Sequence, residues 1–222
     1  MQNLSLIQSI AVYAIPALLA ITVHEAAHGY AARHFGDRTA EMLGRLTLNP
    51  LKHIDPVGTI LVPLTLLIMA NMSGGQLFLF GWAKPVPVSI RNLRNPRRDM
   101  ALVAAAGPGS NLAMAATWTL ILGIAGAMPR GGMLVEPLVY MAIFGVFFNV
   151  LLAIFNLLPL PPLDGGRVLG GFLSPKASAS LDRIEPYGFF IIIALMVTGI
   201  LWQVVGPIIR LVSGFFFNLV GA

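Results

Sequence analysis

Residues 20–30 read AITVHEAAHGY and place two histidines and a glutamate inside an otherwise apolar run. The run extends from about residue 5 to residue 32, long enough for a helix to span a bilayer with some tilt. A charged side chain at the centre of such a helix costs roughly 2.5–3.5 kcal/mol. His24, Glu25 and His28 therefore need partners that justify their position.

The composition of the whole chain is that of a membrane protein. Of its 222 residues, 57% are hydrophobic and 10% are charged, whereas a soluble globular chain carries about 25% charged residues. The chain has no cysteine, which excludes disulfides and Cys-ligated metals. The net charge of +5 lies beside apolar segments, which indicates loops that face anionic lipid, with no nucleic-acid partner.

The apolar segments predict an all-α polytopic membrane protein with about five transmembrane segments. Residues 1–222 are expected to form a single membrane domain. Gly206-Pro207 is expected to end the last segment, and whether the short apolar tail 206–222 adds a sixth span is left open. The expected spans are 5–32, 100–128, 137–160 and 187–205, together with the short apolar run 57–72.

The distribution of Lys and Arg predicts the orientation of the chain. Residues 33–52 carry four of them and residues 84–98 carry five, which puts both loops in the cytoplasm and the N-terminus outside. Because both flanks of residues 57–83 are basic, the chain should enter and leave on one side. This predicts a re-entrant hairpin with an extended edge around residues 57–88; the alternative is one ordinary span that breaks the charge rule.

The three polar residues of the opening stretch form the pattern H-E-x-x-H. On a helix, positions i and i+4 share a face, so both imidazoles can converge on one Zn²⁺. Glu25 is then close enough to act as a general base toward a metal-activated water. The alternative is a pair of structural histidines with a paired glutamate, which a membrane span disfavours because each polar group there needs a partner.

Catalytic zinc usually takes three protein ligands, so a further His, Asp or Glu is required. The segment 137–160 is followed by PPLDGG, where Asp164 is the only carboxylate. Pro161-Pro162 end the helix and Gly165-Gly166 permit a tight turn, so Asp164 can point back inward. It reaches the side of His28 only if residues 57–83 return to the side they left. The alternative is an ordinary acid at a helix end.

These motifs together resemble the site-2 protease family of intramembrane zinc metalloproteases. The resemblance rests on HEAAHGYAARHFGD, NPLKHIDPVGT, GWAKPVPV, AGPGSN and NLLPLPPLDGG, which spread over residues 24–166. The chain departs from several relatives because no span precedes the motif helix and 140 positions separate His24 from Asp164. It also lacks a PDZ or CBS domain.

The resemblance implies that His24, His28 and Asp164 bind one Zn²⁺ per chain and that Glu25 is the base. It implies that Asn156 lies near the substrate carbonyl, where an amide N–H would stabilise the developing oxyanion. The implied activity is hydrolysis of a peptide bond in or near the transmembrane segment of a single-span membrane protein. The implied location is the bacterial inner membrane, with the active site toward the cytoplasm.

Other residues have roles that the sequence leaves open. The stretch Trp82, Lys84, Pro85, Val86 and Pro87 is predicted to form an extended edge that pairs with a substrate strand; the alternative is a membrane-surface anchor. His53 could contact substrate, brace the site or be an ordinary loop histidine. Asn111 is expected to give structural support to the metal helix.

Two other functions remain open from sequence. A metal-ion transporter also carries intramembrane His and Asp residues, although its ligands should be strung along several helices. A non-proteolytic scaffold on the same fold should lack a catalytic residue, and none of the expected set is missing. The substrate, the trigger and the oligomeric state are not encoded in any recognisable pattern.

Overall fold

The structure, a computed structural model, describes residues 5–62, 64–65, 68, 81–129, 132 and 134–221. Over these residues every regular element is helical, which confirms the predicted all-α class. The α-helices are α1 (Leu6–His34), α2 (Thr39–Met42), α4 (Pro96–Ala127), α5 (Val135–Asn156), α6 (Asp164–Phe172), α7 (Pro175–Asp182), α8 (Glu185–Val197) and α9 (Ile200–Asn218). Three short elements, η1 (Pro50–Lys52), η2 (Pro56–Leu61) and η3 (Ile90–Asn92), lie between α2 and α4.

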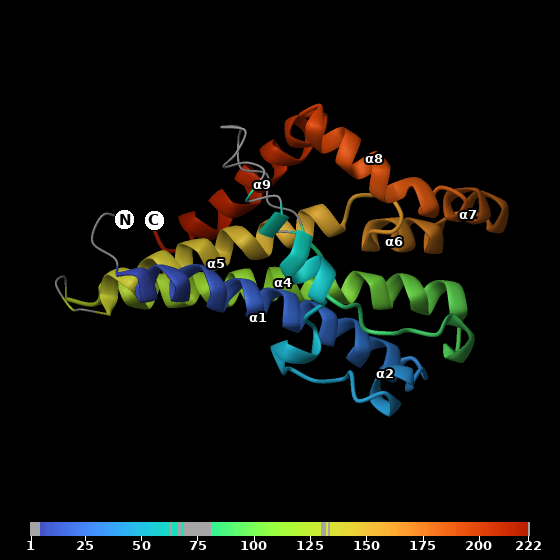
Figure 1. The fold of residues 1–222 in the computed structure, drawn as a ribbon, viewed down its shortest axis with the longest axis horizontal. Helices are drawn as coiled ribbons and strands as arrows, with labels where there is room; N and C mark the ends of the chain where they lie inside the picture. The colour runs from blue at the N-terminus through green and yellow to red at the C-terminus, as the bar shows by residue number, and fades with distance from the viewer. Residues whose placement is uncertain are drawn as a thin grey trace.

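The described residues include four helices, α1, α4, α5 and α9, that are long and apolar enough to cross a membrane. Helices α1, α4 and α5 run side by side, with α4 antiparallel to the other two, and α9 packs along α5 (Figure 1). Their largest core cluster contains Trp118, Val146, Val150 and Val205, all buried. These contacts hold α4, α5 and α9 together, and α1 packs against α4 and α5.

The C-terminal end of α1 and the N-terminal end of α4 lie at the same end of the bundle (Figure 1). The Arg94 amide donates to the Phe35 carbonyl oxygen at 3.1 Å, which ties the two ends together. The chain between these helices therefore starts and finishes on one side, as the charge pattern predicts. Because of this return, α5 runs parallel to α1 and delivers Asp164 to the level of the two histidines.

The two described ends of the predicted hairpin lie beside each other. The Trp82 amide donates to the Gly58 carbonyl at 3.1 Å, and the Lys84 amide donates to the His53 carbonyl at 2.9 Å. The Thr59 hydroxyl donates to the Trp82 carbonyl at 2.9 Å. Residues 63, 66–67 and 69–80 of that prediction lie outside the described residues.

The predicted division of the C-terminal region is wrong. Helix α8 ends at Val197, and Gly199, two residues later, takes a φ of 76°. Helix α9 then begins at Ile200 and continues through Gly206 and Pro207. Glycine tolerates this left-handed conformation, whereas Pro207 removes one N–H donor without ending the helix. The predicted segment 187–205 is therefore divided between α8 and α9, and the tail after residue 206 belongs to α9, a candidate span.

Candidate metal centre

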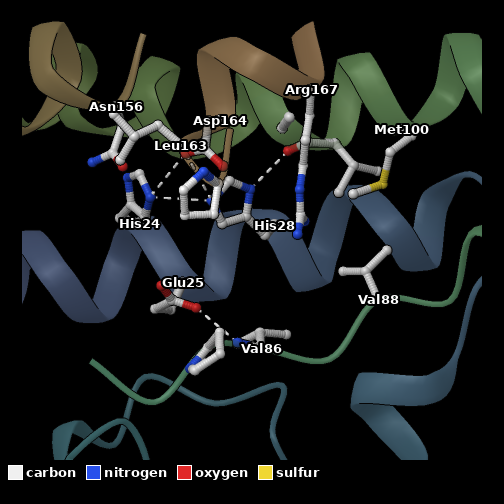
Figure 2. A pocket seen from close by; sticks show the side chains of 14 residues that line it. His24, Glu25, His28, Val86, Val88, Met100, Asn156, Leu163, Asp164 and Arg167 are labelled. Carbon is white, nitrogen blue, oxygen red and sulfur yellow. Dashed lines mark hydrogen bonds and ion pairs between the residues drawn. The ribbon is translucent and has the colours of Figure 1, made fainter. Parts of the chain in front are cut away.

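Three side chains from two helices converge on one point. On α1, the Nε2 atoms of His24 and His28 lie 3.1 Å apart. Asp164, the first residue of α6, places Oδ2 at 3.2 Å from Nε2 of His24 and 3.3 Å from Nε2 of His28. Among the described residues this is the one group of three His, Cys, Asp or Glu side chains close enough to hold a metal ion (Figure 2).

The turn that aims Asp164 depends on close backbone packing. The Pro161–Pro162 peptide is cis, and Leu163 is extended immediately before the helix begins. Gly165 and Gly166 pack directly on the backbone of residues 157–161, so a Cβ at either position would collide with main-chain atoms. The missing side chains let α6 start tightly against the end of α5, and the Asp164 carboxylate faces α1.

A buried chain of amides fixes the tautomer of His24. The Asn111 Nδ2 donates to the Ala20 carbonyl at 3.2 Å and to Asn149 Oδ1 at 3.0 Å, and Asn149 Nδ2 donates to the Gly145 carbonyl at 2.8 Å. Because carbonyl oxygens only accept, both amide orientations are determined. Asn111 Oδ1 therefore accepts from Nδ1–H of His24 at 2.7 Å, which in the neutral imidazole leaves a free lone pair on Nε2.

In its neutral form His28 adopts the same tautomer through a different contact. Its Nδ1 lies 2.8 Å from the Val103 carbonyl oxygen, which can only accept, so Nδ1 carries the proton. Two imidazole lone pairs and a carboxylate then face one another, an arrangement that needs a cation between them. The separations of 3.1–3.3 Å match the edges, about 3.3 Å, of a tetrahedron with metal–ligand bonds near 2.0–2.1 Å. The donor set therefore fits Zn²⁺.

The charge of Asp164 suits this role. Burial by itself raises the pKa of the Asp164 carboxyl, but hydrogen bonds and positive charge from protonated imidazoles of His24 and His28, which stand in for the cation, lower that pKa to about 2. The carboxylate is consequently ionised at neutral pH.

Gly107 on α4 gives the two histidines their space. A Cβ at this position would collide with the imidazole rings of both His24 and His28. Gly109, two residues along the same helix, has no atom within 4 Å of its hypothetical Cβ. The close approach of α4 to the metal centre therefore depends on a glycine at position 107 only.

The convergent side chains open onto a cavity of about 180 Å³. Asn156 lines this cavity next to His24, and its Nδ2 donates to the Leu152 carbonyl at 3.0 Å. An amide nitrogen carries two hydrogens, so Asn156 keeps a second N–H for a molecule in the cavity. The other side chains that line it include Met100, Val103, Leu163 and Arg167.

Glu25 lines the same cavity, but its carboxylate is not part of the metal-binding group. Its Oε2 accepts a hydrogen bond from the Val86 amide at 2.8 Å. Figure 2 shows this carboxylate on the other side of α1 from Asp164, turned toward Val86.

The predicted edge is held along one side by the rest of the protein. The amides of Trp82 and Lys84 donate to Gly58 and His53, and the Arg45 guanidinium donates to the Lys84 carbonyl at 2.9 Å. Of the edge residues, Pro85 and Val86 line the cavity, whereas Trp82, Lys84 and Pro87 do not.

His53 lies away from the cavity. It is buried, and its Nε2 donates to the Thr47 carbonyl at 2.9 Å while its own carbonyl accepts from Lys84. These contacts brace the edge. The sequence did not predict roles for Asn149, Arg45 and Arg167. Of these, Asn149 could have been found, because an amide inside an apolar membrane segment needs a polar partner.

Comparisons with known proteins agree with this chemistry. The sequence profile of Peptidase family M50 matches residues 122–199, which include Asp164. YwhC of Bacillus subtilis, named as a candidate zinc metalloprotease, is 39% identical over 198 residues, covering 88% of this chain and 84% of YwhC. Rip2 of Mycolicibacterium smegmatis, named in the same way, is 30% identical over 82% of this chain and 64% of Rip2. No solved structure matches the chain.

Proposed function

The chain belongs to Peptidase family M50 and is a zinc-dependent membrane protease, and we propose that it cleaves a transmembrane segment of another membrane protein. The observation that carries this proposal is the position of the metal-binding group. Its two histidines lie within α1, a helix long and apolar enough to span the bilayer, and not on an appended soluble domain. A substrate that stays in the membrane would reach them directly.

In this proposal His24, His28 and Asp164 hold the zinc ion. When bound, zinc supplies Lewis-acid activation of a water molecule for attack on a peptide carbonyl. Nδ1–H of His24 and Nδ1–H of His28 remain donated to Asn111 and Val103, which keeps both Nε2 lone pairs aimed at the ion.

Two further side chains would serve the reaction. The Glu25 carboxylate would take a proton from the attacking water and return it to the leaving amine nitrogen. Asn156 would donate its second N–H to the carbonyl oxygen as negative charge develops there. Both residues line the cavity beside His24, which supports these roles.

The substrate is expected to be a single-span protein whose helix unwinds locally before cleavage. Within a helix the scissile carbonyl is occupied by an intrahelical hydrogen bond, so an extended partner must replace that pairing. Residues 82–88 offer such a partner, because Pro85, Val86 and Val88 line the cavity and the stretch is anchored to residues 53–59.

The orientation follows from the basic loops. Residues 33–52 and 84–98 carry most of the basic side chains and would lie in the cytoplasm of a bacterium, with the N-terminus outside the inner membrane. Water would then enter the cavity from the cytoplasmic side, the end of α1 that follows His28.

The test uses purified protein in detergent with a library of single-span substrates, and it measures bound zinc and cleavage by mass spectrometry. Glu25→Gln should keep one zinc per chain and lose cleavage, whereas Asp164→Ala should lose both. Glu41→Gln, which changes an exposed acid paired with Arg33, is the control and should keep both. Full cleavage by Glu25→Gln would contradict the role of Glu25 as the base, and stoichiometric zinc in Asp164→Ala would contradict the role of Asp164 as a ligand. Zinc flux into proteoliposomes without cleavage would indicate a transporter.

A further inference from the structure

The general base proposed above is held by a backbone amide. Glu25 Oε2 accepts from the Val86 N–H at 2.8 Å, and its carboxylate lies outside the group formed by His24, His28 and Asp164 (Figure 2). Figure 2 shows the carboxylate on the other side of α1 from Asp164, so the Glu25 side chain has to turn toward that group, and away from Val86, to exchange protons with a water there.

The register of the edge shows what else could occupy that amide. The N–H groups of residues 82, 84 and 86 all donate to the protein itself, a period of two that is characteristic of extended chain. Pro85 and Pro87 have no N–H, so the opposite side of the edge has no donor at these two positions. The donors near the cavity are therefore Val86 and, two residues on, Val88, which also lines it.

A peptide strand added along residues 86–88 would require the Val86 N–H. An amide hydrogen aimed at one carboxylate oxygen at 2.8 Å cannot also serve a peptide carbonyl well, so the two acceptors compete. The binding of substrate backbone and the position of the base are consequently linked through one hydrogen atom.

We propose that the Val86 amide is a shared donor that holds Glu25 away from the metal-binding group until a substrate strand takes its place. This inference rests on the function proposed above. In the empty enzyme the carboxylate stays on Val86; a substrate carbonyl that accepts from Val86 releases it toward the reacting water. Val86 is thus a positioning residue. When a bound chain does not pair with the Val86 amide, the Glu25 carboxylate stays hydrogen-bonded to Val86, away from the metal-binding group.

The first test measures amide hydrogen exchange on the metal-free, full-length protein, so it does not depend on turnover. Because Pro85 and Pro87 have no amides and the first residue of a fragment loses its label, a fragment covering residues 84–88 reports only Val86 and Val88. Glu25→Ala should raise the exchange rate at Val86 at least tenfold, and Glu25→Gln, which keeps a neutral acceptor, should raise it less. The Lys84 amide, bonded to His53, should not change in either variant and reports that the edge is intact.

The second test measures binding of a Leu-Ala hexapeptide in which one peptide bond is replaced by CH₂–NH. Removing the competing carboxylate should make this peptide bind about tenfold more tightly to Glu25→Ala than to the unmodified protein. Glu41→Ala should bind it like the unmodified protein.

Equal affinities, unchanged exchange at Val86, or no binding to Glu25→Ala would each overturn the shared-donor proposal. These outcomes are separable from failure of the protease assignment, because neither test measures cleavage or zinc content. If the protein binds zinc and cleaves substrates, but the Val86 amide exchanges at the same rate in Glu25→Ala, Glu25→Gln and the unmodified protein, the proposed function stands and the shared-donor proposal is wrong.

Discussion

His24 Nδ1 lies 2.7 Å from Oδ1 of Asn111, a residue 87 positions further along the chain and fully buried on α4. Asn111 in turn donates to Asn149 on α5, so one line of hydrogen bonds crosses the three central helices. This line orients an imidazole inside an apolar bundle and offsets the cost of burying it.

Asn111→Ala should weaken zinc binding about 10- to 100-fold, because His24 loses the acceptor that fixes its protonation and ring orientation. Competition with a chelator of known affinity measures this effect. Asn149→Ala leaves Asn111 in contact with His24 and Ala20 and should weaken zinc binding less. Equal zinc affinity in Asn111→Ala and the unmodified protein would contradict the role of the amide chain.

Gly107→Ala should abolish zinc binding, since the new methyl group would occupy the space of both imidazole rings. Gly109→Ala is a matched control on the same helix, where the methyl group meets no atom within 4 Å. Replacing an interior helix glycine with alanine stabilises by roughly 0.5–1 kcal/mol, so this control should keep its zinc and unfold at a slightly higher temperature. Zinc content after gel filtration distinguishes the two variants.

Arg45→Ala should raise KM about tenfold with little change in bound zinc. The guanidinium donates to the Lys84 carbonyl at 2.9 Å, so its loss frees the edge that is proposed to receive substrate. Arg38→Ala, an exposed arginine on the same loop, is the control. A fall in kcat at unchanged KM would instead place Arg45 in the chemical step.

Asp37→Asn should destabilise the protein by about 2–3 kcal/mol at neutral pH. Asp37 is buried and accepts from the Ser89 amide at 2.6 Å and from Asn92 Nδ2 at 3.0 Å, which ties the end of α1 to the edge. Burial raises the pKa of Asp37, but these hydrogen bonds and those from Thr39 outweigh it and lower the pKa below 3.8.

The sign of that shift predicts the pH dependence of the same variant. A depressed pKa contributes stability above the unfolded-state value of 3.8, and this contribution is lost as pH falls toward the folded-state pKa. Thermal unfolding in detergent at pH 7 and below pH 4 should therefore show the difference between Asp37→Asn and the unmodified protein shrinking on acidification. A difference that stays constant with pH would show that ionised Asp37 adds nothing.

Much of the site could be predicted because its key spacing is local. His24 and His28 are four positions apart, and helical geometry alone brings them together. Asp164 required a second argument, from the turn residues around it and from the side on which each helix ends. The contact of Glu25 with Val86 could not be predicted, because nothing in either local pattern encodes which amide a side chain meets 61 positions away.

The sequence predicts the number and place of most helices, but not every helix end. Apolar runs locate the membrane segments, but they do not say where one helix ends inside a continuous apolar stretch. Gly206-Pro207 is a pattern that commonly ends a helix, yet α9 continues through it. A membrane helix can contain a proline, because neighbouring groups satisfy the carbonyl that the missing N–H leaves unpaired. The break occurs at Gly199, the residue that adopts a left-handed conformation.

The separation of 140 positions between His24 and Asp164 also matters while the chain is being synthesised. A chain emerges from the ribosome N-terminus first, so α1 is in place long before α6 has been translated. During that interval the nascent chain holds two imidazoles and a glutamate but no third ligand. Under the proposed function, the protease could therefore not attack its own later helices, or those of neighbouring chains at the insertion site, before Asp164 has been synthesised.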